Sequence, residues 1–200
     1  MKIIKHRINT IEELVSTPKL YGVEIDLRSS NSQLILEHDP FSSRHVKFTD
    51  WLKFYNHDFL IINVKEDGLE KKILEITDKF GITNFFLLDQ AFPTLYKFSE
   101  NHRSLSCARI SDIESVETAL KLNVGWIWFD SHTGNWDYLQ NAFNRFAGFK
   151  FNTCLVSPEL QRKDYMKEIE FLKKEIARLD ISFDAVCTKD QSLWVNNFFI

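Results

Sequence analysis

Eight short apolar runs, separated by amphipathic stretches, limit the fold of this chain more than any other feature. Segments with helical spacing, such as 69–80 and 165–179, lie between the runs. Strands that alternate with helices pair in parallel through crossovers, and eight such units are typical of a (β/α)8 barrel. We therefore predict an α/β protein, a small (β/α)8 TIM barrel forming a single domain over residues 1–200. The predicted strands are 2–6, 22–28, 59–65, 84–89, 105–110, 124–130, 151–157 and 184–189, with a ninth short run at 34–38.

A doubly wound open sheet is the alternative architecture. The sequence has neither the GxGxxG fingerprint nor the Walker motif with which such sheets bind phosphates, and no repeat or linker stands out.

Two spacings also predict where helices begin, because Thr10 with Glu13, and Ser111 with Glu114, match the capping box.

The charge balance argues against a nucleic-acid partner, since 25 basic and 28 acidic residues leave a net charge of −3 without a basic stripe. No apolar run is long enough to span a membrane, and the N-terminal residues lack the apolar stretch of a secretory signal. The three cysteines, an odd number at wide spacing, do not form a disulfide framework, and we expect them to be buried core residues. We expect a cytoplasmic protein with a small-molecule substrate, and the oligomeric state stays open.

Polar residues stand at the ends of these otherwise apolar runs. In a parallel barrel the carboxyl ends of the strands form one face, which carries the active site. We therefore expect the side chains at these ends to meet around one opening. They are His6, Arg7, Glu24, Asp26, Asn63, Lys65, Asp89, Arg109 and Asp130.

The segment GVEIDLR indicates a cation site. Glu24 and Asp26 share one face of the predicted strand, while Val23, Ile25 and Leu27 share the other. In a barrel the apolar face meets the helices, so the two carboxylates would point inward. Two buried carboxylates repel each other unless a cation lies beside them, and Mg²⁺ or Ca²⁺ suits oxygen ligands. The alternative is an ordinary strand whose charged side faces water.

Two further pairs of residues extend this pattern. Asn63 and Lys65 share one face of their strand, where a lysine can hold a phosphate oxygen or can simply reach the solvent. His6 and His38 end two of the runs, and an imidazole can accept or donate a proton near neutral pH. A lone histidine is more commonly structural, but two of them bracket the Glu24–Asp26 pair.

The order of these motifs resembles the glycerophosphodiester phosphodiesterase family, whose pattern reads roughly HRG, ENT, G-x-E-x-D, HD and E-x-K. It is also similar to the related phospholipase D-like toxins (sphingomyelinase D), which share the barrel. The resemblance is strong over residues 1–65 and weaker but collinear to residue 190. The matching segments are His6-Arg7, Asn9-Thr10, Gly22-x-Glu24-x-Asp26, His38-Asp39, Asn63-x-Lys65 and Cys187-Thr188-Lys189-Asp190.

The resemblance implies a (β/α)8 barrel, a divalent cation, Mg²⁺ or Ca²⁺, and a small phosphodiester substrate with an alcohol leaving group. In these families the attacking group is often a neighbouring hydroxyl of the substrate, which gives a cyclic phosphate. The implied roles are general acid and base for His6 and His38, metal ligands for Glu24, Asp26 and Asn63, and phosphate binding for Arg7 and Lys65. Auxiliary candidates are Asp89, Arg109, Trp128 and Asp130, and both Trp126 and Trp128 are expected near the mouth.

The sequence departs from the family pattern in three places. Ile8 replaces the glycine of HRG, and Asn63 replaces an acidic metal ligand. An amide oxygen brings no charge, so metal affinity should fall unless Asp89 or Asp130 supplies a carboxylate. Many family members carry an insertion after the HD motif, but here only about twenty residues separate His38 from the third long strand. The insertion is therefore nearly absent, which predicts an open site. The Asp130-Ser131-His132 run is not expected to be a triad, since adjacent residues rarely converge in that geometry.

The first functional hypothesis is therefore a metal-dependent phosphoric diester hydrolase, or a lyase that releases a cyclic phosphate. The second is a catalytically degenerate barrel that binds a phosphorylated ligand without turnover. The third is an unrelated barrel enzyme that acts on sugar phosphates. A cation between Glu24 and Asp26, with histidines on either side, would favour the first hypothesis.

Overall fold

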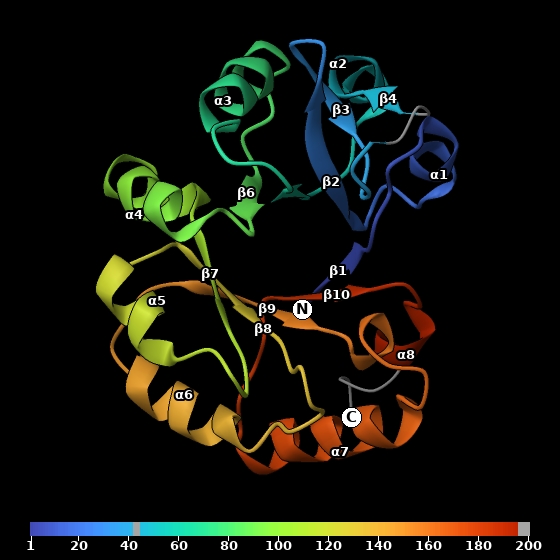
Figure 1. Ribbon diagram of the computed structural model, residues 1–200. Coiled ribbons are helices and arrows are strands. Elements are labelled where there is room, and N and C mark those ends of the chain that lie inside the picture. The colour runs from blue at the N-terminus through green and yellow to red at the C-terminus, as the bar shows by residue number, and fades with distance from the viewer. Residues whose placement is uncertain (42–44, 196–200) are drawn as a thin grey trace.

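The computed structural model describes residues 1–41 and 45–195. Its parallel strands stand in the middle of a ring of helices, as Figure 1 shows. This is the TIM barrel that the alternation of the runs predicts. In the described ranges, the barrel strands are β1 (Lys2–Lys5), β2 (Gly22–Ser30), β5 (Leu60–Val64), β6 (Phe85–Leu88), β7 (Cys107–Ile110), β8 (Trp126–Phe129), β9 (Asn152–Val156) and β10 (Ala185–Thr188). The α-helices around them are α1 (Ile11–Ser16), α2 (Phe48–Trp51), α3 (Glu70–Lys79), α4 (Phe92–Asn101), α5 (Val116–Leu122), α6 (Tyr138–Phe146), α7 (Met166–Arg178) and α8 (Ser192–Val195).

The strands pair in parallel with their neighbours around the barrel. β1 lies between β10 and β2, β2 continues to β5 and β6, and β7 continues through β8 and β9 to β10. Within the described part of the chain, a single bridge, Leu87 to Ser106, joins β6 to the segment that leads into β7. The register places Asp26 of β2 opposite Asn63 of β5, so the residues of two predicted motifs lie beside each other.

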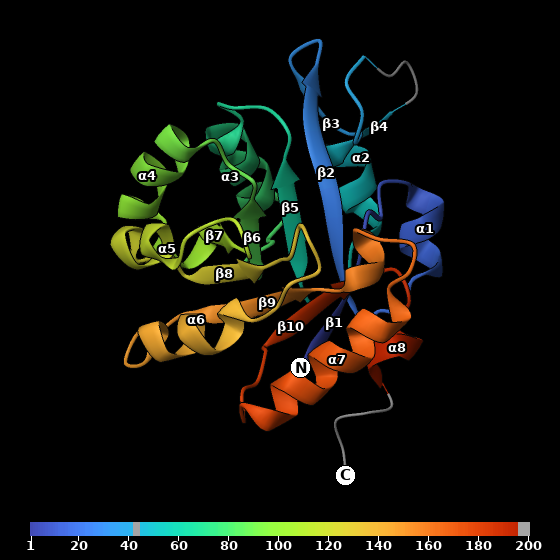
Figure 2. The same cartoon turned by 60° about the horizontal axis from the view of Figure 1, so that its bottom comes forward.

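A hairpin extends β2 beyond the other strands, as Figure 2 shows. β2 pairs antiparallel with β3 (Gln33–Leu36), which in turn pairs with the short β4 (Val46–Lys47). The turn residues Asn31 and Ser32 both have positive φ, 47° and 62°, as tight two-residue hairpins require. The ninth apolar run therefore forms a strand as predicted, whereas β4 was not predicted from the sequence.

The core has two layers on opposite faces of the strands. Val23, Ile25 and Leu27 pack outward in one cluster with helix residues such as Leu14 and Ile73. A second cluster fills the lumen, where Trp126 packs against the rings of Phe59 and Phe86 at centroid distances of 5.0 and 4.8 Å. Trp126 thus lies in the packed lumen, below the mouth at which the sequence placed it. The three cysteines belong to this lumen cluster, where they are buried and free as expected.

One of the two predicted helix starts is correct. Thr10 and Glu13 form both hydrogen bonds of a capping box at α1. The hydroxyl of Ser111 accepts a hydrogen bond from the backbone N–H of Glu114, but this closes a turn ahead of the helix, and α5 is capped by Ser115 instead. No helix in the described ranges has both the length and the apolar character needed to cross a membrane.

Candidate functional site

A cavity of about 220 Å³ opens at the carboxyl ends of the strands, and we call it the central cavity. It lies where a TIM barrel carries its active site, and residues that the sequence analysis singled out line it from both halves of the chain. Those residues are His6, Arg7, Glu24, Asp26, His38, Asn63, Lys65, Asp89, Arg109, Trp128 and Asp130.

Glu24 and Asp26 point inward, as the alternation along β2 predicts. Each is 1 % exposed. The Asp26 carboxylate lies 3.1 Å from Lys65 Nζ and 3.4 Å from Arg7 Nε. Asn9 braces the same residue, since its Nδ2 donates to Asp26 Oδ2 and its Oδ1 accepts from the Asp26 N–H, both at 2.9 Å. Asp26 is therefore held in place from three sides.

Glu24 is held by the backbone of the first loop. Its Oε2 accepts a hydrogen bond from the Arg7 N–H at 2.7 Å. Burial, followed by repulsion from Asp26, raises the pKa of Glu24 from 4.5 to about 7. Arg7 has a φ of 56°, a left-handed conformation that is uncommon outside glycine and that often marks functional sites.

The replacement of the motif glycine by Ile8 has a structural explanation. The left-handed conformation falls on Arg7, and Ile8 has no positive φ in the described backbone. Ile8 is instead 7 % exposed and packs in the outer core, while its N–H donates to the Glu24 carbonyl at 2.8 Å. The first loop thus approaches β2 closely without a glycine at this position.

The two histidines have different surroundings. The side chain of His6 is 15 % exposed, and its Nε2 lies 3.9 Å from Glu24 Oε2. Burial, and then the positive charge of Arg7, lowers the pKa of His6 to about 3, so His6 is neutral near physiological pH. His38 is more exposed, and its Nδ1 lies 2.7 Å from Asp39 Oδ1. The guanidinium of Arg28 fixes the backbone at this point with two hydrogen bonds to the His38 carbonyl.

The oxygens around Asn63 fit a hard divalent cation. Asn63 is 7 % exposed, and its Oδ1 has no hydrogen-bond partner among the described residues. Two carboxylates and one amide oxygen are ligands that Mg²⁺ and Ca²⁺ accept. Glu24 and Asp26 supply the two carboxylates, so the third oxygen would be that of the Asn63 amide. In residues 1–41 and 45–195, no cluster of three or more His, Cys, Asp or Glu residues is suited to a metal.

Arg109 joins the two acidic residues that could have replaced the missing carboxylate. Its guanidinium pairs with Asp89 at 2.5 Å and also with Asp130. Gln161 Nε2 donates to both oxygens of Asp130, at 3.3 and 3.1 Å. Both carboxylates are therefore already paired with Arg109, and the expectation that Asp89 or Asp130 supplies a carboxylate to a metal site stays a prediction.

Trp128 lies among the polar residues of the central cavity. It is 4 % exposed, and its Nε1 has no hydrogen-bond partner in the described part of the chain. Ser131, in contrast, is fully buried, and its hydroxyl donates to the Asn135 carbonyl at 3.1 Å. As the sequence analysis expected, the Asp130-Ser131-His132 run forms no triad.

Two residues that shape this site, Asn9 and Gln161, were not predicted from the sequence to have a role in it. Asn9 was part of a quoted motif, and its position just after the first strand could have indicated a brace for β2. Gln161 follows β9 in a short turn, where no local pattern marks it.

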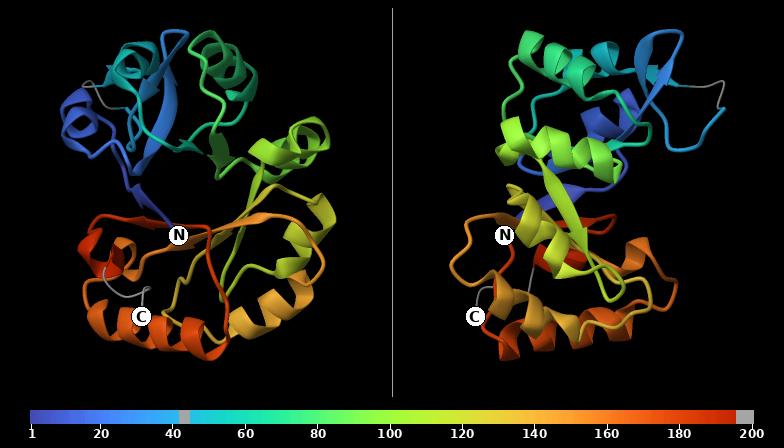
Figure 3. Two further views of the ribbon diagram at one scale, coloured as in Figure 1. Left: turned by 180° about the vertical axis from the view of Figure 1, so that it is seen from behind. Right: turned by 60° about the vertical axis from the view of Figure 1, so that its left-hand side comes forward.

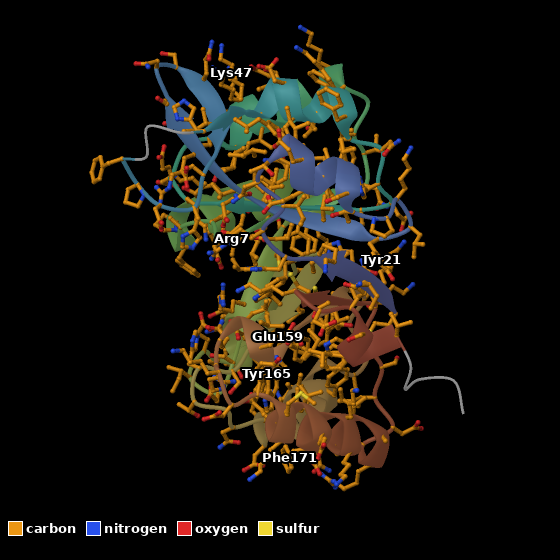
Figure 4. The ribbon with its side chains drawn as sticks, turned by 90° about the vertical axis from the view of Figure 1, so that its right-hand side faces the viewer. Arg7, Tyr21, Lys47, Glu159, Tyr165 and Phe171 are labelled. Atoms are coloured by element: carbon orange, nitrogen blue, oxygen red, sulfur yellow. The ribbon has the colours of Figure 1, made fainter. Side chains whose placement is uncertain are left out.

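The two halves of the mouth face each other in Figure 4, which labels Arg7 on the N-terminal half and Glu159 on the C-terminal half.

Two solved structures are similar to this chain. A glycerophosphodiester phosphodiesterase from Thermotoga maritima has a TM-score of 0.69 and 17 % sequence identity, and the match covers 96 % of each chain. A glycerophosphoryl diester phosphodiesterase from Parabacteroides distasonis has a TM-score of 0.64 and 13 % identity over 94 % of this chain and 82 % of its own. No family model and no curated protein matches the sequence. At these identities the likeness establishes the fold.

Proposed function

We propose that this protein is a phosphodiesterase that cleaves a small glycerophosphodiester-like substrate with the help of a divalent cation. One observation carries the proposal. Three buried polar atoms, His6 Nδ1, Asn63 Oδ1 and Trp128 Nε1, lack partners among the described residues, and all three residues line the central cavity. An unpartnered buried polar group costs about 1–3 kcal/mol, so a bound ligand and ion would relieve all three.

The charges around the cavity suit an anionic substrate. Arg7 and Lys65 both pair with Asp26, and their two positive charges equal the negative charges of Glu24 and Asp26 when both carboxyl groups are ionised. A bound Mg²⁺ or Ca²⁺ would therefore leave the cluster positive. The cation would be held by Glu24, Asp26 and Asn63, and it would stabilise negative charge on the phosphoryl oxygens. Arg7 and Lys65 would then bind those oxygens directly, as cationic donors do.

The two histidines would transfer the protons. Neutral His6 would accept the proton of the attacking group, either water or a neighbouring hydroxyl of the substrate. His38, whose Nδ1 lies 2.7 Å from Asp39 Oδ1, would donate a proton to the alkoxide that leaves when the P–O bond breaks. Positioned proton transfer of this kind contributes about 10²–10⁴-fold to the rate.

The experiment is a screen of glycerophosphodiesters with Mg²⁺, with Ca²⁺ and with a chelator, followed by ³¹P NMR. We expect a phosphomonoester or a cyclic phosphate to form only when a divalent cation is present. His6→Ala should abolish turnover, while His102→Ala, beyond the end of α4 and outside the cavity, should leave it intact. Absence of turnover with every diester, by a folded protein, would refute the proposal.

A second candidate is a barrel that binds a phosphorylated ligand without cleaving it. The observation that favours it is the pairing of Lys65 and Arg7 with Asp26, which already satisfies one carboxylate without an ion. This candidate predicts that a glycerophosphodiester binds in calorimetry, with an affinity that does not depend on divalent cations, and is recovered uncleaved.

A further inference from the structure

The barrel wall is interrupted beside the central cavity. β5 and β6 pair over four residues, as do β7 and β8. Between β6 and β7, the described residues show only the bridge from Leu87 to Ser106. The helices outside these strands, α4 and α5, lie side by side in Figures 1 and 3. The interruption therefore lies beneath two neighbouring helices.

A second cavity of about 350 Å³ lies at this interruption, and we call it the lateral cavity. Asp89 and Arg109 line both the lateral and the central cavity. The two cavities therefore adjoin, with the Asp89–Arg109 ion pair at their boundary. Asp89 has a φ of 58°, so the backbone is in an uncommon conformation where the cavities meet.

The lateral cavity offers hydrogen-bond acceptors to a ligand. Gln90 is 8 % exposed, and its Nε2 donates to Glu70 Oε1 at 3.2 Å. Its Oε1 has no partner within residues 1–41 and 45–195, although it is buried. The carboxylates of Asp89 and Glu114 add further acceptors to the lining. The cavity thus suits a group that carries several hydroxyl donors.

The lining also has an apolar side. Phe92, at the start of α4, is 59 % exposed, and Leu95 follows one turn later. An exposed aromatic ring beside carboxylate and amide acceptors can pack on the apolar face of a ring whose hydroxyl groups point outward. Thr118 of α5 lines the cavity from the other side. A larger side chain at this position would therefore fill part of the cavity.

We propose that the lateral cavity is a subsite for one alcohol group of the phosphodiester, and that this group is a polyhydroxylated ring, such as a sugar or a cyclitol. The inference rests on the proposed function. With the phosphate at Arg7 and Lys65, the ring extends past Arg109 and donates hydroxyl hydrogen bonds to Gln90 Oε1 and Asp89. The subsite makes the protein selective for diesters that are larger than the central cavity alone would hold.

The experiment compares glycerophosphoinositol with glycerophosphoethanolamine as substrates for the cation-loaded protein. We expect kcat/KM to favour the inositol diester by roughly tenfold, as two or more added hydrogen bonds allow. Thr118→Phe fills the cavity and should remove that preference, with kcat/KM for the inositol diester falling to the level of the ethanolamine diester. Lys121→Phe adds the same side chain to an exposed position of α5 outside the cavity and should keep the preference.

Binding of the two diesters, measured by calorimetry, separates this proposal from the proposed function. If neither diester is cleaved, the proposed function fails, yet weaker binding of the inositol diester alone to Thr118→Phe would still support the subsite. Equal effects of Thr118→Phe on both diesters, or no effect, would overturn the subsite. A preference for the ethanolamine diester that Thr118→Phe removes would overturn the assignment to a polyhydroxylated ring. Unfolding curves for both variants show whether they remain folded.

Discussion

Replacing Glu24 with glutamine should stabilise the metal-free protein while removing a proposed metal ligand. Glu24 is fully buried, and burial together with the charge of Asp26 raises its pKa from 4.5 to about 7. Glutamine has nearly the same shape and keeps an oxygen that can accept the 2.7 Å hydrogen bond from the Arg7 N–H. The change therefore removes the buried charge and leaves the contacts in place.

The size of the expected stability gain follows from the pKa shift of Glu24. One pKa unit corresponds to about 1.4 kcal/mol, so ionised Glu24 lowers the free energy of unfolding by about 3 kcal/mol. Below pH 4.5 the carboxyl group is protonated in both the folded and the unfolded state, and it has no such effect. The loss of stability grows as the pH rises from 4.5 through about 7. Glu24→Gln should therefore gain up to about 3 kcal/mol at about pH 8 and almost nothing at about pH 4.

Urea unfolding in the presence of a chelator, followed by tryptophan fluorescence at both pH values, measures this gain. Glu100→Gln is the matched control, because Glu100 is exposed on α4, and we expect it to change the free energy of unfolding by less than about 0.5 kcal/mol. A Glu24→Gln protein that is no more stable than the parent at about pH 8 would show that the buried carboxylate is not destabilising.

Three other changes test separate parts of the structure. His38→Ala should lower kcat/KM by at least about 100-fold with an unchanged circular dichroism spectrum, and near-parent activity would exclude His38 from the proton transfers. Asn63→Asp adds a carboxylate to the proposed cation site, and calorimetry should show roughly tenfold tighter binding of Mg²⁺ or Ca²⁺, whereas an unchanged affinity would place the ion elsewhere. Leu172→Ala, at a fully buried position of α7, should cost about 2–5 kcal/mol in chemical unfolding. Phe171→Ala on the outer side of α7 (Figure 4) should cost much less, and equal losses would contradict the packing described here.

The strands of the barrel could be predicted because each one is a local signal. Runs such as 59–65 and 184–189 are mostly apolar, and the strands found there, Leu60–Val64 and Ala185–Thr188, lie inside those bounds. The inward direction of Glu24 and Asp26 followed from the period of two residues along a strand, since the alternate residues are apolar. The same reasoning brought residues from separate strands to one face, because parallel strands end at a common edge.

Contacts between distant segments could not be predicted in this way. The pairing of Arg109 with both Asp89 and Asp130 depends on how three strands are placed relative to one another at the mouth. The sequence does not indicate that placement, so the two carboxylates were considered as metal ligands instead. Trp126 was expected near the mouth because it shares a face with Trp128, but it stands two residues deeper, where it packs on Phe59 and Phe86. The thin connection between β6 and β7 left no local trace either, since each strand is individually regular.

The uneven pairing around the barrel has a consequence for its spontaneous opening. Four residue pairs join β1 to β10 on one side, whereas in the described ranges one bridge joins β6 to the segment before β7 on the other. Cys107 begins β7 beside that bridge, while Cys154 and Cys187 sit on strands that are paired along both edges. Cys107 lines the lateral cavity but is only 3 % exposed, and burial raises the pKa of its thiol well above the usual value. An alkylating reagent should therefore modify it mainly when this part of the wall opens. Cys107 should therefore be labelled before the other two cysteines, and its labelling rate would report how often this part of the wall opens.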